Sequence, residues 1–227
     1  MTALSEHCCT SYRDMLLYQG HIGKSRVYTY VHSMTRKPTR ERILDAVVEL
    51  HEEVGPAATT ISAIAERAGV QRLTVYRHFP DERALIQGCS AHWSEGHPPP
   101  DPSDWAGVED PRERLEAALR ALYAYYENGR AMMVQIFRDE EKVPALREVM
   151  APHHTFMAEM AGGLAAGWGV QEETQRLIRA AVGHALRFET WRSLSDEGLS
   201  NEEAAAMMSR LVVGLATAKA GRAGGGM

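Results

Sequence analysis

The sequence predicts an all-α protein made of two helical regions, and three observations support this. From Thr39 onward, apolar residues recur every three or four positions almost throughout, which is the period of an amphipathic helix. No run shows the apolar–polar alternation of a strand. A Pro-rich stretch at residues 97–102 interrupts the pattern, because consecutive prolines cannot lie inside a helix. We therefore expect one helical domain over residues 36–95, a linker over residues 96–110 and a second helical domain over residues 111–220.

The first helical region is predicted to hold four helices. The first begins near Thr39 and ends at Gly55-Pro56. Thr60 is a natural N-cap for a short second helix, and Gly69 ends it because glycine adopts the positive φ of a tight turn. A third helix is expected over residues 71–79, and Pro80-Asp81 closes it and caps a fourth.

Five helices are predicted after the Pro-rich stretch. Their periodic apolar positions cover residues 111–127, 131–142, 144–166, 172–194 and 201–219. Pro152 lies inside the third of them and is expected to kink or split it. A bundle of this size can enclose a cavity between its helices.

The two ends of the chain fall outside the helical pattern. Residues 1–35 contain two adjacent cysteines and four tyrosines, without a sustained helical period. They are either a flexible arm or upstream sequence translated from a start codon chosen too early, and we favour the second interpretation. Residues 221–227 are rich in glycine, so we expect a flexible tail there.

Composition excludes several classes of protein. The 227 residues are 44% apolar and 24% charged, so the chain can bury a core. The formal net charge is -5, so any contact with nucleic acid must come from a local basic patch. The apolar runs are far shorter than the ~20 residues that span a bilayer, and the N-terminus does not have the pattern of a signal peptide. We expect a cytoplasmic protein.

Residue types that bind metals or perform catalysis are sparse and poorly spaced. Cys8 and Cys9 are adjacent and Cys89 stands alone, so no zinc or disulfide framework is indicated. His153 and His154 are also adjacent, and neighbouring helical positions point about 100° apart, which makes them poor joint ligands. We find no nucleophile elbow, phosphate-binding glycine loop or framed pair of carboxylates. The sequence therefore predicts no metal, no cofactor and no enzymatic activity.

The segment over residues 60–79 has the plan of a helix-turn-helix, in which two short helices meet at a glycine turn and the second enters the major groove. Val75 and Phe79 are expected to face the core. The outward residues suit DNA contact, since arginine pairs with guanine, leucine meets a thymine methyl, and hydroxyls and imidazole reach phosphates. They are Arg72, Leu73, Thr74, Tyr76, Arg77 and His78. Lys37 belongs to a basic cluster that precedes the first helix.

This segment resembles the N-terminal signature of the TetR family of bacterial transcriptional repressors. The signature reads Ala65-x-x-Ala68-Gly69-Val70-x-x-x-Thr74-Val75-Tyr76-Arg77-His78-Phe79, followed by Pro80, Ala84 and Leu85. The resemblance covers about residues 39–93, and the downstream half matches the family only in size and helicity. It implies that Arg72 and Leu73 read bases. It further implies backbone or groove-edge contacts from Thr60, Ser62, Thr74, Tyr76 and His78.

The chain departs from the family pattern where the fourth helix opens. The family often has a lysine there that contacts phosphate, whereas this chain has Glu82 beside Arg83. A carboxylate cannot donate to phosphate, so this contact is either lost or moved to Arg83.

The resemblance also implies a homodimer that responds to a small-molecule effector and binds a double-stranded DNA operator. Methionine and aromatic residues at helical spacing are candidates for the effector pocket: Tyr123, Tyr126, Met133, Phe137, Phe156, Met160, Phe188 and Trp191. The last two long helices are expected to pair with those of the partner through Ala181, Ala185, Met208, Leu211 and Leu215.

We predict a DNA-binding regulator, and most simply a repressor that its effector releases. The alternative from another class is an all-α small-molecule carrier or enzyme whose N-terminal hairpin is only structural. A third possibility is a DNA-bound activator or adaptor.

Overall fold

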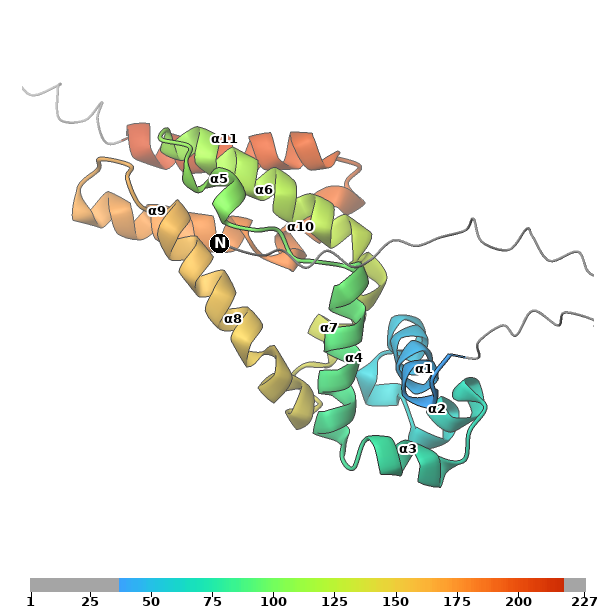
Figure 1. Ribbon diagram of the computed structural model, residues 1–227. Helices are drawn as coiled ribbons and strands as arrows, with labels where there is room; N and C mark the ends of the chain where they lie inside the picture. The colour runs from blue at the N-terminus through green and yellow to red at the C-terminus, as the bar shows by residue number, and fades with distance from the viewer. Residues whose placement is uncertain (1–36, 219–227) are drawn as a thin grey trace, which may run out of the picture. The chain divides into compact units, whose positions relative to one another are not determined.

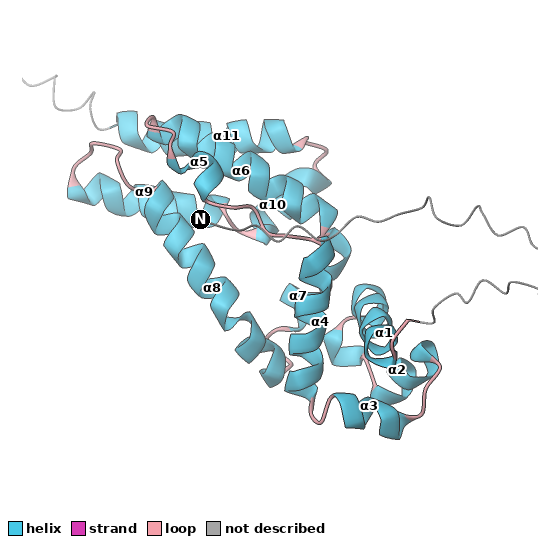
Figure 2. Ribbon diagram, viewed as in Figure 1, coloured by secondary structure: helices cyan, strands magenta, loops and turns pink. Residues whose placement is uncertain are grey.

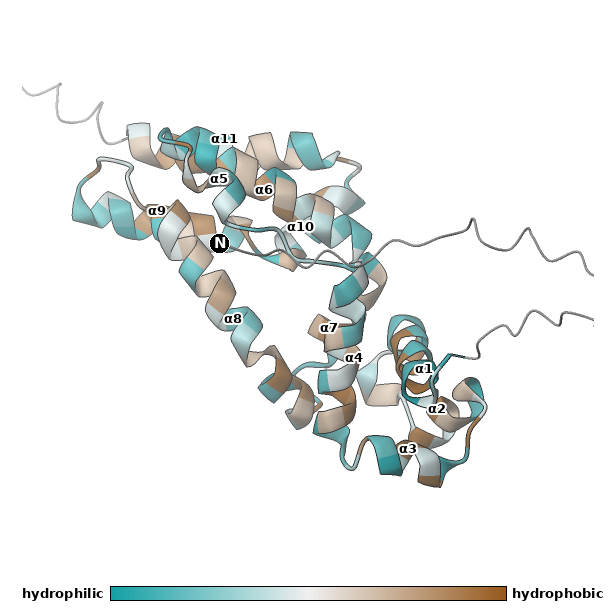
Figure 3. Ribbon diagram, in the orientation of Figure 1, coloured by the Kyte–Doolittle hydropathy of each residue, from teal (hydrophilic) through white to brown (hydrophobic). Residues whose placement is uncertain are grey.

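Helices make up the whole ordered framework of residues 37–218, the part of the chain that the structure, a computed structural model, describes (Figures 1 and 2). The predicted N-terminal extension and C-terminal tail lie outside the described residues. No strand occurs within residues 37–218, and none of the helices there has the length and apolarity of a membrane span. Figure 3 shows hydrophobic and hydrophilic residues alternating along the helices, as amphipathic packing requires.

The first four helices are α1 (Thr39–Glu53), α2 (Ile61–Ala68), α3 (Arg72–His78) and α4 (Glu82–Gly96), with a short 3-10 turn η1 (Pro56–Ala58) after α1. They share one apolar core in which Ile43, Val47 and Val75 are completely buried. The predicted caps are present: Thr60 and Asp81 accept backbone N–H groups at the starts of α2 and α4. These caps satisfy amides that would otherwise lack partners at a helix start.

The remaining helices form a second apolar core. They are α5 (Ser103–Ala106), α6 (Pro111–Asn128), α7 (Arg130–Asp139), α8 (Pro144–Leu164), α9 (Glu172–Ala185), α10 (Phe188–Asp196) and α11 (Asn201–Ala218). Helix α11 packs along both α6 and α9, and α8 crosses toward α9 (Figure 1). The centre of this core is aromatic, with the Tyr126 ring edge-on to Phe188 at 5.4 Å between centroids.

Three features differ from the sequence-based expectations. The Pro-rich linker contains α5, and Trp105 of that helix is buried in the second core. Pro152 lies inside α8, and of the kink or split expected there the split is absent, since α8 continues as one helix from Pro144 to Leu164. The helix expected over residues 172–194 is broken at Arg187, whose backbone is extended and which precedes α10.

Helices from the two sides of the Pro-rich stretch also pack on one another. Helix α4 packs along α8, and α1 packs along α7 (Figure 1). A polar cluster, here called the α7 anchor, joins the end of α7 to the segment that follows α1. In it the buried Asp139 carboxylate accepts the Ala57 N–H at 3.1 Å, and the Arg138 guanidinium donates to the Val54 carbonyl at 2.9 Å. The first four helices are therefore held by the helices that follow them.

Candidate nucleic-acid interface and ligand cavity

The turn between α2 and α3 is built around Gly69. Its φ of +63° lies in the left-handed region, and the N–H groups of Gly69 and Val70 return to carbonyls of α2. Arg42 of α1 donates to the carbonyls of Ala68 and Gly69, so this arginine supports the turn. The geometry fixes α3 against α2 as a helix-turn-helix.

Helix α3 divides sharply into a buried and an exposed face. Val75 is fully buried, and Phe79 at the end of the helix is 3% exposed. On the opposite face, Leu73 is 74% exposed and Tyr76 is 51% exposed. Leu73 and Tyr76 are three positions apart and therefore lie on the same face of α3, where they form a small exposed apolar and aromatic surface.

The other predicted contact residues surround this exposed face. Arg72 and Arg77 are exposed on α3, whereas Thr74 and His78 are half-buried at its shoulders. Thr60 and Ser62 are exposed at the start of α2, and the Arg72 guanidinium donates to the Ser62 hydroxyl at 3.1 Å. Lys37 is exposed but lies in an ion pair with Asp45 at 2.8 Å.

Three acidic residues of α1 are paired with cationic side chains or a histidine. Arg67 of α2 bridges Glu49 at 3.1 Å and Glu53 at 2.8 Å, both on α1. Asp45 is shared by Lys37 and His92. Helix α3 itself contains two arginines and no acidic residue. Its exposed face therefore presents positive charge and hydrogen-bond donors, which suits a phosphate backbone.

Known proteins share both the motif and the longer chain. The family model for bacterial regulatory proteins of the tetR family matches residues 43–89. The chain is 30% identical over 178 residues to the HTH-type transcriptional repressor KstR of Rhodococcus jostii, and the match covers 74% of this chain and 73% of KstR.

This chain belongs to the TetR family.

Three further proteins are similar to part of the chain or to its fold. The uncharacterised regulator YvkB of Bacillus subtilis is 41% identical over 58 residues, which are 31% of YvkB. Thus the match spans less than a third of that relative. Among solved structures, a TetR-like regulator from Rhodococcus has a TM-score of 0.55 at 20% identity, covering 83% of this chain and all of that one. NalD, the secondary repressor of a multidrug efflux pump in Pseudomonas aeruginosa, has a TM-score of 0.51 at 19% identity, covering 77% of this chain and 94% of that one. Likeness at this identity establishes the TetR fold.

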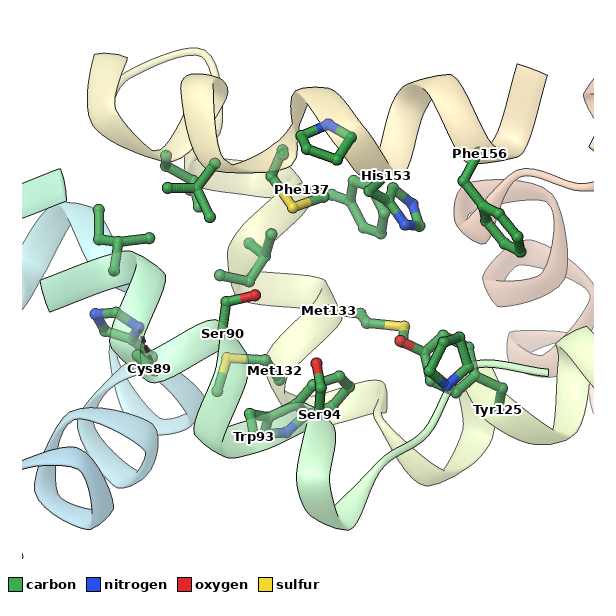
Figure 4. Close-up of a pocket in the computed structure, with 18 residues that line it drawn as sticks. Cys89, Ser90, Trp93, Ser94, Tyr125, Met132, Met133, Phe137, His153 and Phe156 are labelled. Carbon is green, nitrogen blue, oxygen red and sulfur yellow. Dashed lines mark hydrogen bonds between the residues drawn. The ribbon is translucent and has the colours of Figure 1, made fainter. Parts of the chain in front are cut away.

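A cavity of about 380 Å³ lies in the TetR-type helical bundle between α4, α7 and α8 (Figure 4). Its size is within the usual range for small-molecule sites. Most of its wall is apolar: Met132, Met133, Ile136 and Phe137 from α7, with Val149, Met150 and Phe156 from α8. Helix α4 contributes Ser90, Trp93 and Ser94, and α6 contributes Tyr125.

Three of the predicted pocket residues line this cavity, and five do not. Met133, Phe137 and Phe156 are in the wall, whereas Met160 lines a separate hollow beside α5. The other four are packed in the second core, none of them more than 2% exposed: Tyr123, Tyr126, Phe188 and Trp191. Periodicity identified buried aromatic residues, but it could not separate a core from a cavity wall.

The two core tyrosines have a structural task at the unexpected helix break. The Tyr123 hydroxyl donates to the Ala185 carbonyl at 2.8 Å, and the Tyr126 hydroxyl donates to the Leu186 carbonyl at 2.6 Å. These carbonyls lie where α9 ends, so they lack the intrahelical partners of a continuing helix. The two phenol groups are therefore used in hydrogen bonds to buried backbone carbonyls of their own chain, and not in contacts to a ligand.

Sequence reasoning missed the side of the cavity that α4 forms. Ser90 and Ser94 are one helical turn apart and so lie on the same face of α4. The helix predicted after Pro80-Asp81 was given no place in the pocket, because it belongs to the first helical region over residues 36–95. The spacing of these two serines beside Trp93 was the available signal.

The residues predicted for the dimer interface also fall into two groups, one buried within the chain and one exposed or half-buried at its surface. Ala185 is fully buried and Met208 is 6% exposed, both packed within their own chain, so they are not available to a partner. Leu211 is 57% exposed, while Ala181 and Leu215 are half-buried. On α9 a large apolar residue, Leu177, is 40% exposed, and the sequence-based prediction did not include it.

Proposed function

We propose that this TetR-family chain is a homodimeric repressor that binds an operator through α3 and is released by a small molecule in the cavity. The observation that carries the proposal is the exposed face of α3, which combines Leu73 and Tyr76 with two arginines above a fully buried Val75. Arg72 and Leu73 would contact base edges. The backbone would be held by Lys37, Thr60, Ser62, Thr74, Tyr76, Arg77 and His78.

A dimer follows from how little of one chain can touch DNA. A seven-residue α3 offers few phosphate contacts, and each contact contributes separately to affinity. Two copies related by a two-fold axis would place their recognition helices about 34 Å apart, on half-sites one helical turn apart. Among the described residues, exposed Leu177 on α9 and Leu211 on α11 support pairing through these two helices.

The route from cavity to DNA would run through α4 and α7. Helix α4 directly follows α3 and supplies one wall of the cavity. Helix α7 supplies another wall, and its far end is tied to the segment after α1 by the α7 anchor. A ligand that prefers one arrangement of these helices shifts the population toward it, and so changes the spacing of the two recognition helices.

Repression is the sign of regulation that the relatives support, since KstR and NalD are both named as repressors. The decisive experiment is selection of bound duplexes from a random DNA pool by the full chain at physiological salt. We expect enrichment of a palindromic sequence whose binding weakens as salt increases. Retention without sequence preference would contradict the proposal, and failure to retain DNA would favour the small-molecule carrier.

A further inference from the structure

The cavity lacks the charged groups that would hold an ion. None of the described residues that line it is Asp, Glu, Lys or Arg. Transferring an unpaired carboxylate or ammonium from water into such an apolar space is strongly unfavourable. An occupant with a net charge would therefore find no counter-charge in the wall.

The titratable groups of the wall are held in their neutral forms. Burial lowers the pKa of His51 to about 4 and raises the pKa of the Cys89 thiol to about 12. The His51 ring and the Cys89 sulfur also contact each other, with Nδ1 and Sγ 3.6 Å apart. On the opposite wall, burial and then the neighbouring His154 lower the pKa of His153. Burial raises the pKa of the Tyr125 phenol.

Two hydroxyls on α4 are free to bind an occupant. Figure 4 shows the oxygens of Ser90 and Ser94 directed toward the space between α4 and α8. A serine within a helix commonly bonds the carbonyl one turn back, yet no hydrogen bond joins the hydroxyl of exposed Ser90 or of half-buried Ser94 to another described residue. Each can donate one hydrogen bond and accept others.

We propose that the cavity takes an uncharged, mainly apolar molecule carrying one hydroxyl or carbonyl oxygen, and that Ser90 and Ser94 bind this oxygen. The inference rests on the proposed function, because it assigns a chemical class to the effector of that same cavity. The methionine-rich and aromatic wall adapts to the apolar body of the ligand. The paired hydroxyls fix its polar end against α4, the helix that follows α3.

The test is titration calorimetry of the full chain, without DNA, with four probes that share one skeleton: ethylnaphthalene, naphthylethanol, naphthylacetate and naphthylethylamine. Naphthylethanol should bind tightest, and the anionic and cationic probes should bind at least ~10-fold more weakly because their charges lose water without gaining a partner. Equal or tighter binding of either charged probe would overturn the inference. So would failure of all four probes to bind.

Substitutions of the two serines then test whether their hydroxyls bind the oxygen of the ligand. In the double variant Ser90→Ala, Ser94→Ala, the advantage of naphthylethanol over ethylnaphthalene should fall by about 5-fold, as expected for the loss of a neutral hydrogen bond. Unchanged ethylnaphthalene binding shows that the cavity of the variant is intact. Ser193→Ala, at an exposed serine on α10, is the matched control and should keep the advantage. An alcohol preference that survives the double substitution would remove the serines from the proposal.

The two proposals can fail separately. If naphthylethanol binds as expected but leaves operator affinity unchanged, the ligand class stands and the effector role fails. If a charged compound binds the cavity and releases operator DNA, the effector role stands and the ligand class fails.

Discussion

At the scale of single residues, Arg72 is restrained before any DNA arrives. Its guanidinium donates to Ser62 at 3.1 Å across the outer surface of the helix-turn-helix. We predict that Arg72→Ala weakens operator binding by about 1–3 kcal/mol and relaxes selectivity at one base pair, as for loss of a bidentate contact to guanine. Quantitative mobility shifts with a set of single-base operator variants measure both effects.

The matched control for Arg72 is Arg67 in the same motif. Arg67 is engaged with Glu49 and Glu53 of α1, and we do not place it on the DNA. Arg67→Ala should leave base selectivity unchanged. If the two alanine variants behaved alike, or if Arg72→Ala kept full selectivity, Arg72 would not read a base.

His51 makes a separate prediction about pH. Its ring is buried, and this burial, partly opposed by Asp139, lowers its pKa from 6.5 to about 4. Between these two values the unfolded chain binds a proton that the folded chain does not, so stability falls as pH decreases through the window. The contribution lost at the lower limit is up to about 3 kcal/mol.

Urea unfolding across that pH window tests the prediction. His51→Gln should reduce the dependence of the unfolding free energy on pH, and the slope that remains should include the contribution of His153, whose pKa is also lowered by burial. His184→Gln, at an exposed histidine of α9, is the matched substitution with which the change in slope is compared. A slope in His51→Gln equal to that of the unsubstituted chain would assign the acid sensitivity to other groups.

At the scale of elements, the starts and stops of the first four helices were predictable because local chemistry sets them. Thr60, Gly69 and Asp81 act within one turn of their own positions. The break between α9 and α10 was not predictable, because its stabilising partners are Tyr123 and Tyr126, more than 50 positions away: the Tyr123 bond, for example, spans 62 residues. Continuous apolar spacing through residues 172–194 therefore concealed the break.

This interpretation of the break predicts opposite outcomes for two neighbouring tyrosines. Tyr126→Phe leaves the Leu186 carbonyl without its partner, so it should destabilise the protein by about 1–3 kcal/mol and leave naphthylethanol affinity unchanged. Tyr125→Phe should change that affinity with little effect on stability, because Tyr125 lines the cavity and its hydroxyl makes no hydrogen bond to a described residue. Thermal unfolding measures the stability of both variants, and titration calorimetry measures their affinity for naphthylethanol. The reverse pattern would indicate that Tyr126, and not Tyr125, contacts the ligand.

The α7 anchor is the contact between elements that we expect to transmit the effect of ligand binding from α7 to the segment after α1. Asp139 is 1% exposed and accepts from Arg138, Lys142 and the Ala57 N–H. In Asp139→Ala the two cations can turn to water, but the Ala57 N–H loses its acceptor, which should cost about 1–3 kcal/mol.

Asp196→Ala is the matched control for Asp139→Ala. It removes an exposed carboxylate paired with Arg130 and should cost less than about 1 kcal/mol. Both values come from urea unfolding, and the effect of naphthylethanol on operator affinity is then compared in the two variants. The proposed route through α7 requires this effect to weaken in Asp139→Ala alone, so equal responses would contradict it.

At the scale of the whole molecule, the sequence predicts that the last long helices pair with those of a second copy, but it could not show which of their side chains the chain itself encloses. Small residues on the predicted helix over 172–194 suggested close approach, yet Ala185 is enclosed by its own chain. Burial depends on how α11 lies along α6 and α9, which no single helix encodes. Leu177 on α9 and Leu211 on α11 stay exposed at the surface of the chain, and these two helices pack side by side.

Leu211→Glu tests whether these helices pair two copies. A carboxylate on each side of a two-fold interface would be desolvated and would face its own copy, so the variant should be monomeric. Val54→Glu introduces the same charge at an exposed apolar residue after α1 and should leave the assembly intact. Sedimentation velocity measures the mass of the assembly, and mobility shifts with operator DNA measure its affinity for the operator. A monomer holds one half-site only, so Leu211→Glu should lose most affinity for the palindrome and retain its weak affinity for a single half-site. A Leu211→Glu protein that stayed dimeric and bound the palindrome fully would place the pairing surface elsewhere on the chain.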